Sequence, residues 1–246
     1  MIKTLLASVG IGAAKVDTIL SSERLYPGSP FTAQIHITGG DVEQRIDHID
    51  LALVTKVKVE INDHTSYQNH CLNQWKIPVN KTVGVGETFT IPFSGQLHPE
   101  TPVTYITEGR IQSHVWLQTG LDIDFAVDPK DVDHLTIMPT PIIEHCLRAM
   151  REFGYRLVKT DVEKGNLRGR HFRSRAGCYQ EFEFQPISRT LFGVKEVELS
   201  FVEDGQVTHV MVERDRAFRG DDYRSISLGH GSGYGHVKGE LRRVLG

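Results

Sequence analysis

The sequence has few cysteines and no long apolar run. Its 246 residues include three cysteines, Cys71, Cys146 and Cys178, and no Cys-x-x-Cys pair. This number and spacing exclude a disulfide scaffold and are typical of a reducing compartment. No stretch approaches the roughly 18 consecutive apolar residues of a membrane-spanning helix. We therefore expect a cytoplasmic protein.

A strong charge of one sign is also missing. The chain carries 28 Lys and Arg against 31 Asp and Glu, a net charge of −3, which argues against nucleic-acid binding because such proteins are usually basic. The charge is unevenly divided, since residues 1–140 have a net charge of −6 and residues 141–246 one of +3. Opposite charges of this kind favour the docking of two domains.

Residues 1–139 have the pattern of an N-terminal β-sandwich. The first 14 residues are similar to a signal peptide, but Gly10 and Gly12 interrupt the apolar part, so we expect a short helix or turn there. Apolar residues then alternate with polar ones, as in half-buried strands, and turn signals separate these runs. The alternating segments are 31–37, 49–61, 89–93, 115–127 and 135–137. Many short strands predict a sandwich.

The pattern changes at residues 139–141, where we place a domain boundary. Residues 141–153 have the spacing of an amphipathic helix, which Thr140 can cap and Gly154 can end. Strands are predicted again around 155–161, 179–185, 194–202 and 207–214. We therefore expect a C-terminal β-sandwich over residues 140–228, with the helix at its start. Residues 229–246 are predicted to form a flexible basic tail.

The sharpest candidate site is a run of arginines bounded by glycines. Arginine side chains in such a loop can hold phosphate, an acidic lipid surface or an acidic protein. The alternative is an exposed loop without a ligand. The candidate partner-binding residues are Arg168, Arg170, Arg173 and Arg175.

Catalytic and metal motifs are weak throughout the chain. There is no Gly-x-Ser-x-Gly elbow and no P-loop, and we expect no enzyme and no cofactor. Cys146 lies on the apolar stripe of the predicted helix, where it serves as a small hydrophobic residue. His230 and His236 fit a tail better than a metal site. An acidic cluster fits a solvated strand face and a turn better than a Ca²⁺ site, although metal binding stays open for it: Asp122, Asp124, Asp128, Asp131 and Asp133.

Several phrases resemble the bacterial sporulation-control proteins. They are Leu5–Thr18, Gly39–Gln44, Thr119–Ile123, Ala126–Asp131, the boundary at Pro139–Pro141 and Gln180–Phe184, and the resemblance extends from residue 3 to about 220. It implies an arrestin-like fold of two β-sandwiches, the second with a helix. It also implies a regulatory protein without enzymatic activity, and it supplies no catalytic residues.

Together these observations predict a cytoplasmic scaffold or adaptor that binds regulatory or structural proteins of the cell. One alternative is a peripheral membrane protein that uses residues 168–175 and the tail. Another is a β-sandwich module that senses a metal or a small molecule. Exposed strand edges also allow self-association into a homo-oligomer.

Overall fold

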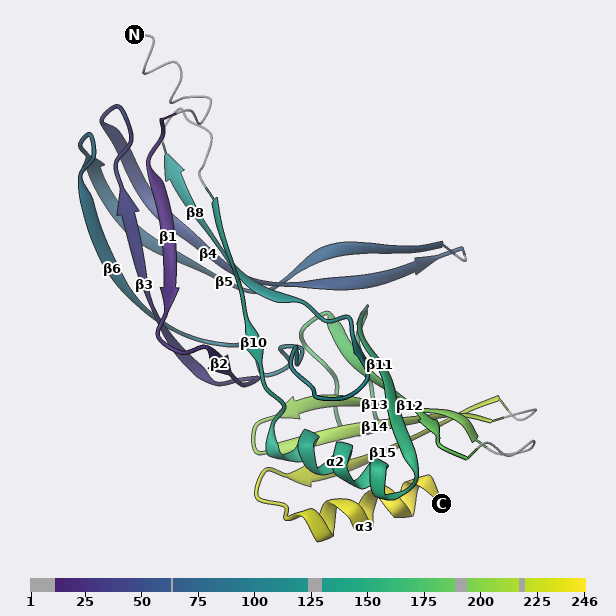
Figure 1. Cartoon of the computed structure of the whole chain (residues 1–246). Helices are drawn as coiled ribbons and strands as arrows, with labels where there is room; N and C mark the ends of the chain where they lie inside the picture. The colour runs from purple at the N-terminus through teal and green to yellow at the C-terminus, as the bar shows by residue number, and fades with distance from the viewer. Residues whose placement is uncertain (1–11, 63, 124–129, 189–193, 217–219) are drawn as a thin grey trace.

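The computed structural model describes residues 12–62, 64–123, 130–188, 194–216 and 220–246. These residues form two lobes, which we call the N-lobe (residues 12–138) and the C-lobe (residues 139–246) (Figure 1). Both are built mainly from strands, so the predicted β-rich class is confirmed. No helix among the described residues is long and apolar enough to cross a membrane.

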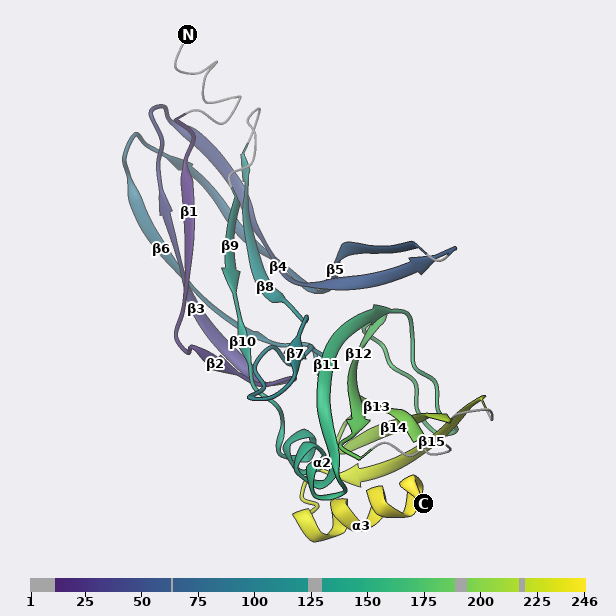
Figure 2. The same cartoon turned by 45° about the vertical axis from the view of Figure 1, so that its right-hand side comes forward.

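The N-lobe is a sandwich of two sheets. One sheet has the order β1 (Lys15–Leu20), β3 (Pro30–Thr38) and β6 (Thr88–Gln96). The facing layer contains β4 (Gln44–Ile61), β5 (His64–Val83), β8 (Val115–Ile123) and β9 (Lys130–His134). Short strands β2 (Arg24–Leu25), β7 (Arg110–Ile111) and β10 (Thr136–Ile137) lie nearer the C-lobe (Figure 2).

Alternation along the strands creates the N-lobe core. In β3 the buried residues are Phe31, Ala33, Ile35 and Ile37, as the sequence predicts. They pack against the buried face of β4 and β8, which includes Ile49 and Leu121. The side chains of successive residues point to opposite faces of a sheet, so the polar residues between them reach the surface.

The C-lobe consists of one five-stranded layer and two helices. Its strands, in spatial order, are β15 (Gly220–Gly229), β14 (Val207–Arg216), β13 (Val194–Asp204), β12 (Cys178–Pro186) and β11 (Tyr155–Lys164). The sequence predicts a second sandwich here. In the structure, α2 (Pro141–Glu152) and α3 (Tyr234–Leu245) cover one face of the layer (Figure 2).

Helix α2 forms as its sequence predicts. Thr140 is its N-cap, Pro141 occupies the first turn, and Gly154 follows the helix with φ of 84°. Cys146 and its apolar neighbours on the same side of α2 are buried against Phe182 and Phe184 of β12. These two phenylalanines therefore share the buried face of their strand, as residues two apart in a strand do.

Residues 229–246 differ from the predicted flexible tail. Val237, Leu241 and Val244 recur at helical spacing and are buried in the C-lobe core. The buried Arg214 of β14 pairs with Asp222 and donates a 2.7 Å hydrogen bond to the carbonyl oxygen of Leu245. Glycine has a low helical propensity, so the glycines of this segment disfavour a helix. Packing of the apolar side chains against the sheet stabilises the helix nevertheless.

Strand β5 was not predicted. It pairs antiparallel with β4 over almost its whole length. Near the C-lobe the pair leaves the sandwich as a ribbon, made of residues 56–61 of β4 and 64–69 of β5 (Figures 1 and 2). An irregularity in the register leaves Leu72 as an extra residue where the ribbon begins. Such bulges bend and twist a strand.

Candidate functional site

The predicted arginine loop spans residues 165–177 and connects β11 to β12. The chain alternates in exposure here, with Phe172, Ser174 and Ala176 buried. All four predicted partner-binding residues are exposed: Arg168, Arg170, Arg173 and Arg175.

Several contacts hold this loop in one conformation. The carboxylate of Glu100 accepts hydrogen bonds from the backbone N–H groups of Arg175 (2.9 Å) and Ala176 (2.8 Å). Within the loop, the backbone N–H of Leu167 donates to the hydroxyl of Ser174 at 2.8 Å. The ring of Phe172 stacks on His209 of β14 with 4.6 Å between ring centroids. The loop is therefore fixed to both lobes before it meets any ligand.

The arginine side chains are poorly neutralised. Arg168 and Arg173 face each other in an isolated antiparallel bridge, an arrangement that is unfavourable for like charges. Arg175 lies 3.6 Å from Asp204 but is 79% exposed. Within the described part of the chain, no ion pair joins Arg168, Arg170 or Arg173 to an acidic residue. The loop thus presents positive charge that an anionic ligand can neutralise.

A second charged surface lies on the C-lobe sheet, on the face opposite the helices. Alternation along β11 to β14 places a group of acidic side chains there, which we call the acidic face. Register pairs Glu183 with Glu198 and Glu198 with Glu213 across three neighbouring strands. The acidic face consists of Asp161, Glu163, Glu181, Glu183, Glu196, Glu198 and Glu213.

Two lysines partly neutralise the acidic face. Lys159 of β11 lies 2.7 Å from Asp161 and 2.5 Å from Glu183. Lys58 comes from β4 of the N-lobe and lies 3.0 Å from Glu163. Although burial disfavours the charged form of Lys58, its hydrogen bonds to acidic neighbours raise its pKa above the ordinary value. The acidic face therefore also joins the two lobes.

The excess of carboxyl groups changes their titration. Burial, followed by repulsion from Glu198, raises the pKa of Glu181 to about 8. Burial, followed by repulsion from Glu213, raises the pKa of Glu198 to about 7. Both carboxyl groups therefore hold protons in a pH range where ordinary glutamates are ionised.

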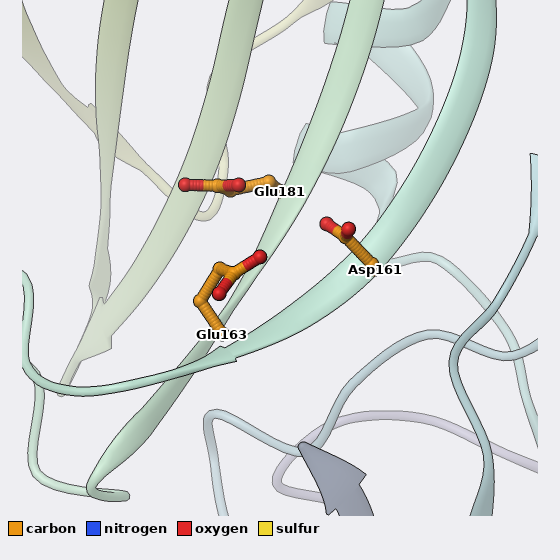
Figure 3. A group of neighbouring side chains, drawn as sticks. All are labelled: Asp161, Glu163 and Glu181. Carbon is orange, nitrogen blue, oxygen red and sulfur yellow. The ribbon is translucent and has the colours of Figure 1, made fainter. Parts of the chain in front are cut away.

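The acidic face contains the two groups of side chains in the described residues that are spaced closely enough for a metal ion. Oxygens of Asp161, Glu163 and Glu181 lie within 4.8 Å of one another (Figure 3), and so do those of Glu181, Glu183 and Glu198. Oxygen ligands suit hard cations such as Ca²⁺. However, the ammonium groups of Lys58 and Lys159 already occupy this neighbourhood.

Among the described residues, Asp122, Asp131 and Asp133 of the aspartate cluster form no group of this kind. Asp124 and Asp128 lie outside the described residues. Asp122 pairs with His48 at 2.8 Å, and Asp131 accepts a hydrogen bond from the backbone N–H of Thr18. Burial, followed by repulsion from Asp131, raises the pKa of Asp133 to about 6.

The histidines and cysteines considered from the sequence are either paired with a neighbour, exposed on a helix or buried in the core. His230 lies 2.7 Å from Glu203, and His236 is exposed on α3. Cys146 and Cys178 are buried, and burial raises the pKa of each thiol to about 12. A thiol that stays protonated is a poor nucleophile.

A cavity of about 570 Å³ lies where the two lobes meet. Its lining includes Pro27, Pro99, Pro141, Glu203 and His230. The volume is in the range of small-molecule sites, but two of its polar lining residues, Glu203 and His230, already contact each other at 2.7 Å.

Comparisons with known proteins agree on one family. The model of the SpoOM protein family, Spo0M, matches residues 2–218. The sporulation-control protein spo0M of Bacillus subtilis (strain 168) is 34% identical over 221 residues, which cover 89% of this chain and 81% of that protein. The crystal structure of Spo0M from Bacillus subtilis superposes with a TM-score of 0.83 at 29% identity, covering 96% of this chain and 98% of the other. The chain therefore belongs to the Spo0M family of sporulation-control proteins.

Proposed function

We propose that this protein is a non-enzymatic regulatory adaptor of the cytoplasm, and that it binds an acidic segment of a protein partner through Arg168, Arg170, Arg173 and Arg175. The observation that carries this proposal is the loop itself. It presents exposed guanidinium groups, of which Arg168 and Arg173 oppose each other, on a backbone that is already fixed.

The chemistry of arginine favours carboxylate-rich partners. A guanidinium group donates two parallel hydrogen bonds to a carboxylate, and several neighbouring groups can follow an extended acidic segment. Because the backbone of the loop is held by Glu100 and by the stacking of Phe172 on His209, little order is lost when a partner binds. The names of the relatives agree with a regulatory role in the cell.

The test compares two variants with the parent. In the first, all four loop arginines are changed to serine. In the control, four exposed lysines elsewhere are changed to serine, so that both variants lose the same charge: Lys15, Lys76, Lys130 and Lys195. Circular dichroism and thermal melting check that both variants are folded.

Binding is measured by fluorescence anisotropy with a labelled glutamate-rich peptide, and partners are captured from the native cytoplasm with cross-linking. We expect the loop variant to lose at least about tenfold in peptide affinity, and the control variant to lose less than about threefold. Equal losses in both variants would contradict a local site. Sedimentation of the parent, but not of the loop variant, with anionic vesicles and without peptide binding would instead assign the loop to a membrane surface.

A further inference from the structure

The ribbon formed by β4 and β5 has an open edge. Its paired residues extend from Lys56 and Asn69 to Ile61 and His64, and both views show it leaving the sandwich with no third strand beside β5 (Figures 1 and 2). Within the described residues, β5 pairs with β4 alone. On the other side of the ribbon, β4 pairs with β11 at Lys58 and Glu163 and buries Val57, so the open edge is that of β5.

This edge lacks the usual protection against strand pairing. Proteins commonly protect edge strands with lysine, other charges, proline or a bulge. Residues 64–75 contain no Lys, Arg, Asp, Glu, Pro or Gly. The bulge at Leu72 protects only the part nearer the sandwich. The side chain of His70 contacts the carbonyl oxygen of Ala176 at 2.6 Å, but among the described residues the main chain of His64–Cys71 pairs with β4 alone.

The neutral edge points to a second copy as its occupant. Two identical strands can pair antiparallel around a two-fold axis, and such a pair brings no like charges together when the segment has none. An acidic peptide, which suits the arginine loop, finds no Lys or Arg within residues 64–71 themselves. Apolar surface at the ribbon also remains open, since Ile61 is 62% exposed and Tyr67 is 50% exposed.

We propose that His64–Cys71 of β5 pairs antiparallel with the same segment of a second copy, so that two ribbons become one four-stranded sheet. An eight-residue strand is about 26 Å long, and the pair forms about eight main-chain hydrogen bonds. The interface is small, so the dimer dissociates at micromolar concentrations, as weak interfaces of this size do.

The test uses charge at the edge. One variant carries Ser66→Lys and Gln68→Lys, and another carries Ser66→Glu and Gln68→Glu. These neighbouring positions are exposed and lie on one face of the ribbon. The control is Gln206→Lys in the exposed turn between β13 and β14. Sedimentation velocity from about 1 to 200 µM measures the dissociation constant.

We expect the parent and the control to dimerise alike, and each edge variant to dimerise at least about tenfold more weakly. An equimolar mixture of the lysine and glutamate variants should recover the dimer, because opposite charges then face each other. A monomeric parent over the whole range, a dimer that the edge variants do not weaken, or failure of the mixture to recover would each overturn the proposal.

A second measurement avoids variants altogether. Hydrogen exchange of the parent at low and high concentration reports on the backbone amides of residues 64–71 directly. We expect these amides to become more protected as the concentration rises, while those of α3 do not change. Unchanged exchange at the edge in a sample that dimerises would place the interface elsewhere and refute the proposal.

Discussion

Replacing Glu181 by glutamine tests the electrostatics of the acidic face. The pKa of Glu181 is about 8 in the folded protein, because of burial and then of Glu198, whereas an ordinary glutamate titrates near 4.5. The folded state therefore holds a proton that the unfolded state has already lost. The stability that this proton contributes is fully present below about pH 4.5 and is lost as the pH rises through about 8.

The magnitude follows from the two pKa values. The interval from 4.5 to about 8 corresponds to an upper limit of about 5 kcal/mol. Glu181 is only partly buried, and its acidic neighbours titrate with it, so water and coupling reduce the effect to about 1–3 kcal/mol. Glutamine has the same shape and no charge. Glu181→Gln should therefore leave the free energy of unfolding almost unchanged at pH 5 and raise it by about 1–3 kcal/mol at pH 8.

Urea denaturation of the parent and the variant at pH 5 and pH 8 measures both values. Glu43→Gln, at an exposed position between β3 and β4, is the control and should show no such dependence on pH. A difference between Glu181→Gln and the parent that is the same at both pH values would refute the reasoning. So would a variant that is less stable than the parent at pH 8.

Two further predictions concern the core. Phe184 is 1% exposed, so Phe184→Asp should destabilise the C-lobe by more than about 3 kcal/mol. Thermal melting measures this loss of stability. The control variant Ile187→Asp, at a position that is 66% exposed, should melt within a degree or two of the parent. A thiol reagent at pH 8 should label Cys71 in the folded protein, because Cys71 is exposed, and should reach Cys146 and Cys178 only after unfolding. Fast labelling of all three thiols in the folded protein would contradict the burial of Cys146 and Cys178.

The elements that the sequence predicts well are those whose pattern is determined locally. In β3 and β12 apolar residues alternate with polar ones, and one face of each strand is buried. Helix α2 adds a cap at Thr140 and a terminating glycine to its apolar stripe. These signals lie within about a dozen residues, so they do not depend on the rest of the fold.

The elements that the sequence misses depend on distant partners. Gly235 and Gly239 lower the helical propensity of α3, and the helix is stabilised by packing against the sheet and by Arg214 at its C-terminal end. Strand β5 has no apolar alternation in residues 64–69 because the side chains on both faces of this part of β5 are exposed. Strand β5 forms because it pairs with β4, and neither the apolar pattern nor the strand propensity of its own residues predicts that pairing.

The two charged surfaces also differ in how far the sequence alone predicts them. The four loop arginines are close neighbours in the sequence, so their run is visible without a structure. The acidic side chains come from four strands, and only the register brings Glu183, Glu198 and Glu213 side by side. In the sequence, the acidic face is indicated only by an acidic residue at every second position, as in Glu181 and Glu183. The same pattern is typical of any solvent-exposed strand face.

The basic loop and the acidic face belong to the same hairpin, so the fold must keep them apart. A free loop that starts at the end of β11 would fold its arginines onto the nearby carboxylates, because opposite charges attract strongly where water is scarce. The backbone hydrogen bonds to Glu100 and the stacking of Phe172 on His209 hold the loop in a conformation in which, among the described residues, Arg168, Arg170 and Arg173 form no ion pair with a carboxylate. Two lysines, Lys58 and Lys159, neutralise part of the acidic face instead. The arginines therefore remain available to a partner, and the same contacts that fix the loop preserve its charge.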